Sequence, residues 1–449
     1  MSPGYAVESN KQLSLPARLT AWWIDWIRVL LQGDLLPEAM PRMAHGWRMI
    51  ATGSLALAGV VRLDAQIDPV PRELIQLGYN QALQGHAPIS GYAFYYRNSP
   101  TFLCSNLTLR LAVAPVYLDS ELGISGALGP NTDLGIGLAG GGFADSYSEI
   151  REGEFIQRES FLGHGGEVST SVYHRFNPGA RIPLYLVLRG STHYSVYGED
   201  NKTDDNFELP PNQTTFRLRT GLRWGGQEPV MLAQLAMELS CWYEAELRLH
   251  PDAYGYADDR EIHNDVHLFW GRAMLAYTLP EWKHNFSVSL TSGTSIHTDR
   301  FSAYRLGGLL PLSAEFPLSL PGYYFQEISA KEFGLLAGIY SVPIDVDQRW
   351  SVAATAAVAG VDYVDGLEQS GKWHSGVGGG VLYRSASGSW QVLVSYAYGI
   401  QALRDGDRGA HSVGFLFQFD LGRTRQSLFD PGDNPNRSRG LQRFIQILR

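Results

Sequence analysis

The residues that could do chemistry gather in one acidic stretch near the middle of the chain. Residues 250–267 read HPDAYGYADDREIHNDVH, in which carboxylates and histidines recur every few positions. Hard oxygen ligands of this kind can hold a divalent cation. His263 and His267 lack the HExxH arrangement and the helical setting of a zinc protease. The pattern favours a solvated acidic loop over a metal site, and we expect neither a metal nor a cofactor.

Nucleophilic chemistry has little support in the sequence. No GxSxG nucleophile elbow occurs, and GISGA at 123–127 lacks the final spacing. Ser295 and His297 in GTSIHTD are a pair that could carry lipase chemistry, but two neighbouring loop residues rarely form a triad. GLAGGG (137–142) is followed by neither a helix nor a lysine, so it is no phosphate loop. We therefore expect that the protein is not an enzyme.

A third group of charges is spaced two residues apart. The charges are Arg217, Arg219 and Arg223 on one predicted strand and Glu238, Glu244 and Glu246 on the next. Residues of one parity share one face of a strand, so these charges can pair across neighbouring strands. They either line a conduction path or fill and neutralise an interior, and the second reading is favoured.

Composition narrows the class of protein. The chain has 449 residues, 49 of them glycine, with 12% aromatic and only 18% charged residues, below the roughly 25% charged residues of soluble domains. A net charge of -9 argues against a nucleic-acid partner. Cys104 and Cys241 are too few for a disulfide framework.

Side chains alternate with a period of two nearly everywhere from about residue 88 onward, which predicts strands rather than helices. The predicted strands are 89–97, 105–117, 132–144, 163–176, 183–196, 213–225, 229–248, 264–278, 284–296, 331–342, 348–361, 374–384, 388–400 and 410–421.

The connections between these strands alternate in length. Short turns such as NPGAR (177–181) and SASGS (385–389) alternate with long acidic or glycine-rich loops. The long loops are 197–212, 249–263, 297–330, 362–373 and 401–410. Outer-membrane barrels have short periplasmic turns, long outer loops, a polar lumen and an apolar outer face. The sequence predicts an all-β fold, a transmembrane antiparallel β-barrel of 14–16 strands, because 145–162 could hold a further hairpin. An even number of strands places both termini in the periplasm.

The expected organisation has five parts. Residues 1–39 fit no targeting pattern and look like a mis-annotated extension, and 40–65 read as a signal peptide, with Arg42 and Arg48 before an apolar segment. A short periplasmic segment is expected at 66–88, the barrel at 89–421 and a periplasmic tail at 422–449.

Four segments resemble the C-terminal barrel of the bacterial surface antigen family, the BamA-like superfamily that also holds the two-partner secretion transporters. RLGG (305–308) and PGY (321–323) look like the family's inward-folding loop, GIYSVPI (338–344) like a conserved strand end, and 376–399 like its glycine-rich hairpin. HSVGFLFQFDL (411–421) looks like its closing strand. The candidate loop residues are Arg305, Gly307, Gly308, Gly322 and Tyr323, and those of the closing strand are Val413, Phe415, Phe417 and Phe419.

The chain departs from this family at several points. The family's loop tip carries an arginine that pairs with acidic groups of the wall, whereas Pro321 stands at that position and has no donor. Ile339 replaces a family glutamate, and 66–88 is too short for a periplasmic POTRA domain. The loop lock is therefore altered, or Arg305 substitutes for it.

The resemblance implies assembly or translocation of polypeptide or lipid across the outer membrane of a diderm bacterium. The family opens between its first and last strands, so a translocase should show a poorly paired seam there, with strand addition on the closing strand. Expected partners are outer-membrane lipids, unfolded polypeptide or a periplasmic protein, with no nucleic acid. A passive channel or structural barrel is the alternative, and a secreted soluble β-protein is a third reading.

Overall fold

The computed structural model describes residues 70–180, 182–226, 235–309 and 316–422. Nearly all of the regular secondary structure in these ranges is β-strand, and 3-10 turns occur at Gln157–Glu159 and Tyr256–Asp258. No helix in these ranges is long and apolar enough to cross a membrane. The expectations for 1–39 and 40–65, and for the tail beyond residue 422, lie outside the described residues.

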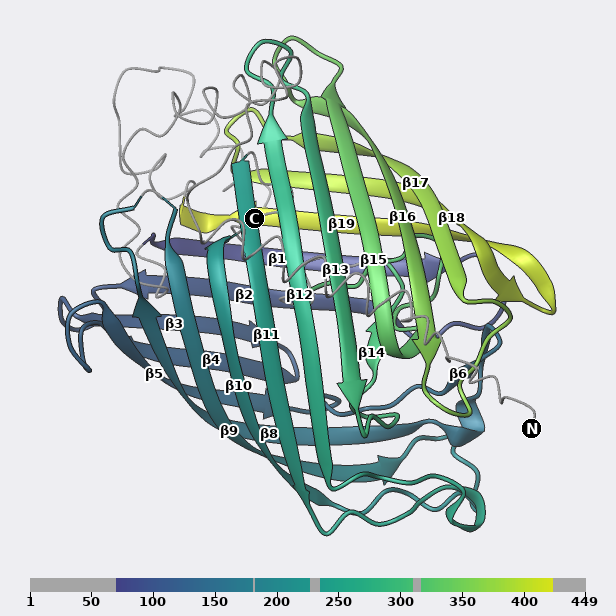
Figure 1. Cartoon of the computed structure of the whole chain (residues 1–449). Coiled ribbons are helices and arrows are strands. Elements are labelled where there is room, and N and C mark those ends of the chain that lie inside the picture. Colours follow the sequence, from purple (N-terminus) through teal and green to yellow (C-terminus); the bar gives the residue numbers. More distant parts are fainter. Residues whose placement is uncertain (1–69, 181, 227–234, 310–315, 423–449) are drawn as a thin grey trace, which may run out of the picture. The chain divides into compact units, whose positions relative to one another are not determined.

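Sixteen strands form one closed antiparallel barrel (Figure 1). They are β1 (Arg72–Ala82), β2 (Gly91–Pro100), β3 (Leu107–Ala114), β4 (Tyr117–Ile124), β5 (Thr132–Gly141), β8 (Phe161–Arg175), β9 (Leu184–Glu199), β10 (Gln213–Gly226), β11 (Leu235–Leu249), β12 (Asp265–Thr278), β13 (Asn285–Ile296), β15 (Ile328–Pro343), β16 (Trp350–Tyr363), β17 (Trp373–Arg384), β18 (Trp390–Arg404) and β19 (Asp407–Asp420).

Each strand pairs with its sequence neighbour, and β19 pairs with β1 from Leu74–Asp420 to Ala82–Ser412, which closes the ring. A three-residue strand, β14 (Tyr304–Leu306), adds to β15, and β6 (Ile150–Arg151) with β7 (Glu154–Phe155) forms a separate hairpin. The predicted fold class is confirmed.

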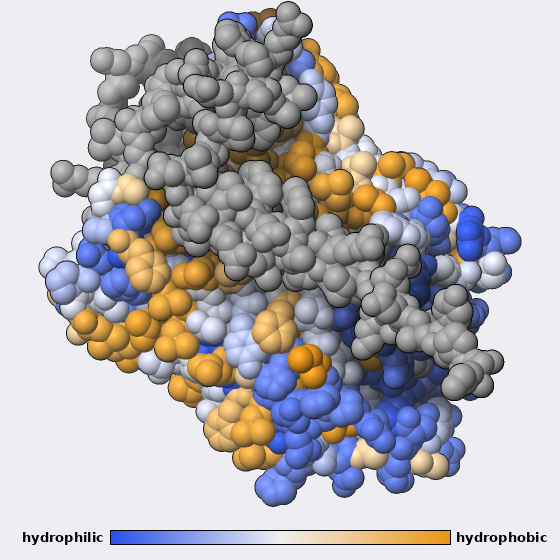
Figure 2. Space-filling model, in the orientation of Figure 1, coloured by the Kyte–Doolittle hydropathy of each residue, from blue (hydrophilic) through white to orange (hydrophobic). Residues whose placement is uncertain are grey.

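The apolar side chains face outward. Along β11, burial follows strict parity: Glu238, Ser240, Glu244 and Glu246 are buried, while the alternate residues Leu239, Cys241, Tyr243 and Ala245 are not. On β18, Val394 and Tyr396 are exposed and the alternate Ala397 is fully buried. Apolar areas cover much of the strand surface in Figure 2, and hydrophilic residues gather over the loops at the bottom of the view. A polar interior inside an apolar outer wall is the arrangement of an outer-membrane barrel.

Two strands lie where the sequence did not predict them. The expected periplasmic segment 66–88 contains β1, in which Ile75, Leu77 and Tyr79 alternate with buried Gln76 and Asn80. The barrel therefore begins at Arg72, not at residue 89.

The predicted strand 105–117 corresponds to β3, and it ends at a turn of Pro115 and Val116. The next strand, β4, at Tyr117–Ile124, was not predicted. The hairpin suspected within 145–162 exists as β6 and β7, but it is not part of the wall.

The two rims of the barrel differ. One rim carries short turns, such as 279–284, 344–349 and 385–389, and both ends of the barrel sheet. The opposite rim, called here the long-loop rim, carries 142–160, 200–212, 250–264, 297–327 and 364–372. The loop expected at 401–410 is instead a tight hairpin, because β18 and β19 continue to a turn at Asp405 and Gly406.

Candidate functional site in the barrel lumen

The segment between β13 and β15 folds back into the barrel. Tyr304–Leu306 pairs with Ile328–Ala330 on β15, and a bridge between Gly308 and Leu320 brings the two arms of the loop together. Leu306, Leu320 and Ile328 are fully buried in an apolar cluster with inward side chains of β15 and β16 such as Leu335. The predicted inward loop is therefore present, and it packs on one half of the inner wall.

The loop tip rests on a pair of wall glycines. Gly376 on β17 and Gly399 on β18 are directly opposite each other in the sheet. A Cβ atom on Gly376 would collide with the carbonyl oxygen of Pro321, and one on Gly322 with the backbone of Gly399. Gly322 also has φ +85°, which favours glycine. The glycines of the predicted hairpin thus give the loop tip room to reach the wall.

Tyr323 is fully buried beside this contact. Its ring approaches the position of a Cβ on Gly399 to 3.0 Å, and its hydroxyl lies 3.2 Å from Nδ1 of His374 on β17. His374 also bonds the hydroxyl of Tyr363, so the loop tip is tied to a buried polar chain within the apolar cluster. Sequence reasoning identified Tyr323 but neither His374 nor Tyr363.

A buried ion pair locks the end of the loop. Both oxygens of Glu327 accept from the guanidinium of Arg404 on β18, at 3.0 and 2.8 Å. The two residues are 1% and 4% exposed, and Arg404 also stacks on Tyr324 with 3.5 Å to the ring centre. A bidentate charge-assisted pair out of water holds its geometry strongly. The charges are reversed relative to the expected lock: the loop supplies the carboxylate and the wall the arginine.

Arg305 does not substitute for the missing loop-tip arginine. It donates to the carbonyl oxygens of Ser148 and Gln326 and lies over the ring of Tyr147, 4.8 Å from its centre. Among the described residues no carboxylate is within ion-pair distance of it. Arg305 instead connects the inward loop to the loop 142–160.

The predicted lumen charges pair with one another. Arg217 contacts Glu246 at 3.0 Å, Arg219 bonds Glu244, and Arg223 contacts Glu238 at 2.9 Å. Glu238 also accepts from Arg272 on β12, at 2.6 Å, a partner that the sequence reasoning missed. The geometry supports the reading in which these charges neutralise the interior.

The long-loop rim is closed by loops that pack on each other. Tyr147, Phe161, Phe207 and Tyr254 form an aromatic cluster from three different loops and β8. Arg260, 2% exposed, lies within ion-pair distance of Glu149 and Glu159. Burial lowers the pKa of Arg260, but these carboxylates outweigh it and raise the pKa above its ordinary value, so the guanidinium stays charged. We call this group of loops the cap.

The cap reaches the far side of the mouth. Gly153, in the turn between β6 and β7, has φ +79°, and a Cβ there would collide with the carbonyl oxygen of Leu403 near the β18–β19 turn. The hairpin of loop 142–160 therefore spans from β5 to the last strand pair.

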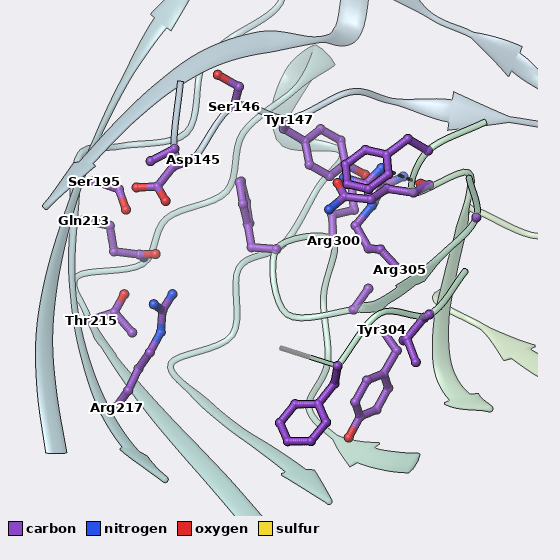
Figure 3. A pocket seen from close by; sticks show the side chains of 18 of the residues that line it. Asp145, Ser146, Tyr147, Ser195, Gln213, Thr215, Arg217, Arg300, Tyr304 and Arg305 are labelled. Carbon is purple, nitrogen blue, oxygen red and sulfur yellow. Dashed lines mark hydrogen bonds between the residues drawn. The ribbon is translucent and has the colours of Figure 1, made fainter. Parts of the chain in front are cut away.

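Cavities lie in the lumen among the described residues. One of about 430 Å³ lies between the wall residues Ser195, Gln213, Thr215 and Arg217 and the loop residues Arg300, Tyr304 and Arg305 (Figure 3). The other, of about 560 Å³, lies beside β4, β5, β8 and β9. Open space is thus present between the charged half of the wall and the inward loop.

The stretch 250–267 assembles no metal site. No group of three or more His, Cys, Asp or Glu side chains in the described ranges could hold a metal ion. Asp265 pairs with His297 at 3.0 Å and lies 3.6 Å from His267. Ser295 donates to the carbonyl oxygen of Lys331, so it forms no dyad with His297. Cys104 and Cys241 are both free and exposed.

The seam between the first and last strands is well paired. Nine residue pairs join β1 to β19, whereas six join β2 to β3. Gln76 donates to Gln418 across the seam at 3.0 Å, inside the barrel. Val413, Phe415, Phe417 and Phe419 lie on the outward face, as predicted, but the edge of their strand is occupied by β1. The poorly paired seam expected of a translocase is not observed.

Comparisons with known proteins support the fold. No protein-family model and no curated protein matches the sequence. The structure is similar to CdiB from Acinetobacter baumannii (10% identity, TM-score 0.50, 78% of this chain and 60% of that one) and to CdiB from Escherichia coli (12% identity, TM-score 0.50, 78% and 63%). BamA from Haemophilus ducreyi, solved without POTRA domains 1-3, matches at 12% identity and TM-score 0.47, with 77% and 70% covered.

The matched region thus spans about three fifths of the CdiB chains. At these identities the likeness concerns the fold alone. The described part of the chain is a sixteen-strand barrel with the fold of the CdiB barrels, and the resemblance in fold that the sequence predicts is confirmed.

Proposed function

We propose that this protein lies in the outer membrane of a Gram-negative bacterium and moves or assembles polypeptide there through a lumen that is closed at rest. The observation that carries the proposal is the inward loop, held by the Glu327–Arg404 pair and by its tip on Gly376 and Gly399. Burying the charges of this pair costs desolvation energy. A loop held against the inner wall by such a pair is expected where closure must be reversible. The fold shared with the CdiB barrels supports the same reading.

The well-paired seam decides the route that we propose. Because β1 and β19 pair over nine residues, we place the path through the lumen, after displacement of the loop, and not between the first and last strands. The same pairing favours the alternative, a structural barrel that transports nothing. A passive channel is disfavoured, because the cap and the loop both occupy the lumen or its mouth.

The test is conductance in planar bilayers. We expect the complete chain to conduct little, and replacement of 308–325 by a short Gly-Ser linker to open the lumen. Glu327→Gln should raise the open-to-closed ratio roughly thirtyfold, because it removes about 2 kcal/mol of charge-assisted bonding. Glu332→Gln is the matched control: Glu332 lies five residues further along the chain, on β15, accepts a hydrogen bond from Thr294 at 3.1 Å, and its replacement should change nothing. Conductance that is unaffected by removing the loop would contradict a loop-gated pore.

A further inference from the structure

Two tryptophans form an aromatic platform on the inner wall, halfway along their strands. Trp242 is the central residue of β11, and Trp270 lies directly opposite it on β12. Their rings are nearly parallel, with 12° between the ring planes and 6.2 Å between the ring centres. Gly221, opposite Trp242 on β10, leaves the space for this ring, because a Cβ atom on Gly221 would collide with it. Three neighbouring strands therefore build the platform.

One side chain of the inward loop covers the platform. The ring of Phe316 meets both indoles edge to face, 5.4 Å from the centre of Trp242 and 5.9 Å from that of Trp270. The guanidinium of Arg272 lies over the Phe316 ring, 4.9 Å from its centre. With Phe316 in place Trp242 is 5% exposed. The lumen of an outer-membrane barrel is polar, so displacement of the loop would bring these indoles into contact with water.

The contact holds Phe316 by its ring alone. No hydrogen bond joins Phe316 to the described part of the chain, and Pro317 beside it has no N–H to donate. Phe316 also lines the 430 Å³ cavity, so open space lies next to its ring. Another aromatic ring in the same place would repeat these contacts, and exchange of one ring for the other would therefore cost little.

The platform offers contacts that Phe316 does not use. The indole N–H groups of Trp242 and Trp270 have no hydrogen-bond partner among the described residues. A buried indole N–H usually finds an acceptor. An aromatic residue of a polypeptide brings a backbone carbonyl oxygen with its ring and can supply that acceptor. A sugar also has acceptors, but it has no π face for the guanidinium of Arg272, so the geometry favours an aromatic residue.

We propose that Phe316 is an internal stand-in for an aromatic residue of the transported polypeptide, and that Trp242 and Trp270 bind this residue when the loop is displaced. Arg272 then lies over the incoming ring, and the indole N–H groups donate to the backbone beside it. The ring can bind only where Phe316 has left, so its binding favours the displaced loop. The proposal rests on the movement of polypeptide proposed above and names the side chain that the lumen recognises.

The test compares two peptides that differ in one side chain. Each is a short dye-labelled Gly-Ser peptide with a single central residue, phenylalanine in one and leucine in the other. Fluorescence anisotropy in detergent micelles measures their binding to the protein in which a Gly-Ser linker replaces 308–325. We expect the phenylalanine peptide to bind about tenfold more tightly, the factor that two aromatic contacts and one cation–π contact provide. The complete chain should show no preference, because Phe316 occupies the platform.

Three variants locate the binding. Phe316→Ala in the otherwise complete chain vacates the platform but keeps the loop, and should show the same preference. In the loop-replaced protein, Trp270→Leu should remove the preference. Phe269→Leu, the neighbouring outward residue, is the matched control and should leave the preference intact. The slower gel migration of heat-unfolded barrels shows whether each variant is folded.

Equal binding of the two peptides, or a preference that Trp270→Leu and Phe269→Leu reduce equally, would overturn the proposal. Binding of maltohexaose that Trp270→Leu abolishes, without any preference between the peptides, would make the platform a sugar site instead. Binding is measured without conductance. A preference for the phenylalanine peptide in a protein whose conductance does not depend on the loop would contradict the gated pore and retain the platform.

Discussion

Glu238 shows what a single lumen residue contributes to this barrel. It is 1% exposed and holds Arg223 and Arg272 together, with a further hydrogen bond from Ser240 at 2.8 Å. Removing one member of a buried ion network leaves uncompensated charge, which costs about 3–5 kcal/mol. Exposed ion pairs contribute at most about 1 kcal/mol.

Glu238→Gln should therefore lower the free energy of unfolding by about 3–5 kcal/mol. Asp347→Asn is the matched control, because it makes the same chemical change in an exposed pair with Arg349, 3.1 Å long. Urea unfolding of the refolded barrel in detergent micelles measures both. Equal stabilities of the two variants would mean that the lumen charges are solvated and not paired.

The sequence predicts best the residues whose position follows from their own strand and its neighbour. The parity of Arg217, Arg219 and Glu246 follows from a strand period of two, and their pairing follows from adjacency of the strands. The lock could not be found in this way, because Glu327 and Arg404 are 77 positions apart. Only the path of the loop through the lumen brings them together. Arg305 has the right type, but its position in β14 directs it toward Ser148.

At the scale of the strand, the two faces of β10 are expected to differ in their tolerance of charge. Leu218 lies outward and is 47% exposed, whereas its neighbours Arg217 and Arg219 face the lumen. Leu218→Arg should cost about 2–4 kcal/mol of stability in a lipid bilayer, because it places a charge in the hydrocarbon layer.

Leu218→Phe retains an apolar side chain of similar reach and is the control. The free energy of unfolding is measured in phospholipid vesicles. In urea-containing buffer without lipid, the two variants are not expected to differ. If Leu218→Arg were as stable as Leu218→Phe, the assignment of this face to lipid would be wrong.

The strands that escaped prediction share a cause. Alternation alone identifies a strand only where turn residues separate it from its neighbours. Between β3 and β4 the turn consists of only Pro115 and Val116, and β4 then carries Asp119 and Glu121 beside Leu118 and Leu122, so the predicted strand stopped at residue 117 and β4 was missed. In β1, Leu74 and Ile75 are adjacent apolar residues and Gly78 interrupts the inward face, which blurs the period. Closure with β19 supplies the pairing that the local pattern does not announce.

The whole molecule is closed by two devices that meet at the last strands. The end of the inward loop is held by Arg404 on β18. The hydroxyl of Tyr324, also in this loop, donates to the carbonyl oxygen of Gln84, which precedes β2. The cap hairpin reaches Leu403. Both devices thus hold the long-loop ends of the strands that flank the seam. Opening could therefore use the lumen, the seam or both, and these routes can be separated.

A disulfide across the seam separates them. Gln76 and Gln418 are directly opposite in the sheet and both face the lumen, within the range of Cα distances that a disulfide bridges. We expect Gln76→Cys with Gln418→Cys, made with Cys104→Ser and Cys241→Ala in the protein lacking 308–325, to conduct equally when oxidised and when reduced. A path through the lumen does not require the seam to part. Each single cysteine variant controls for the effect of the oxidant. Conductance that disappears on oxidation and returns on reduction would place the opening between β1 and β19 instead.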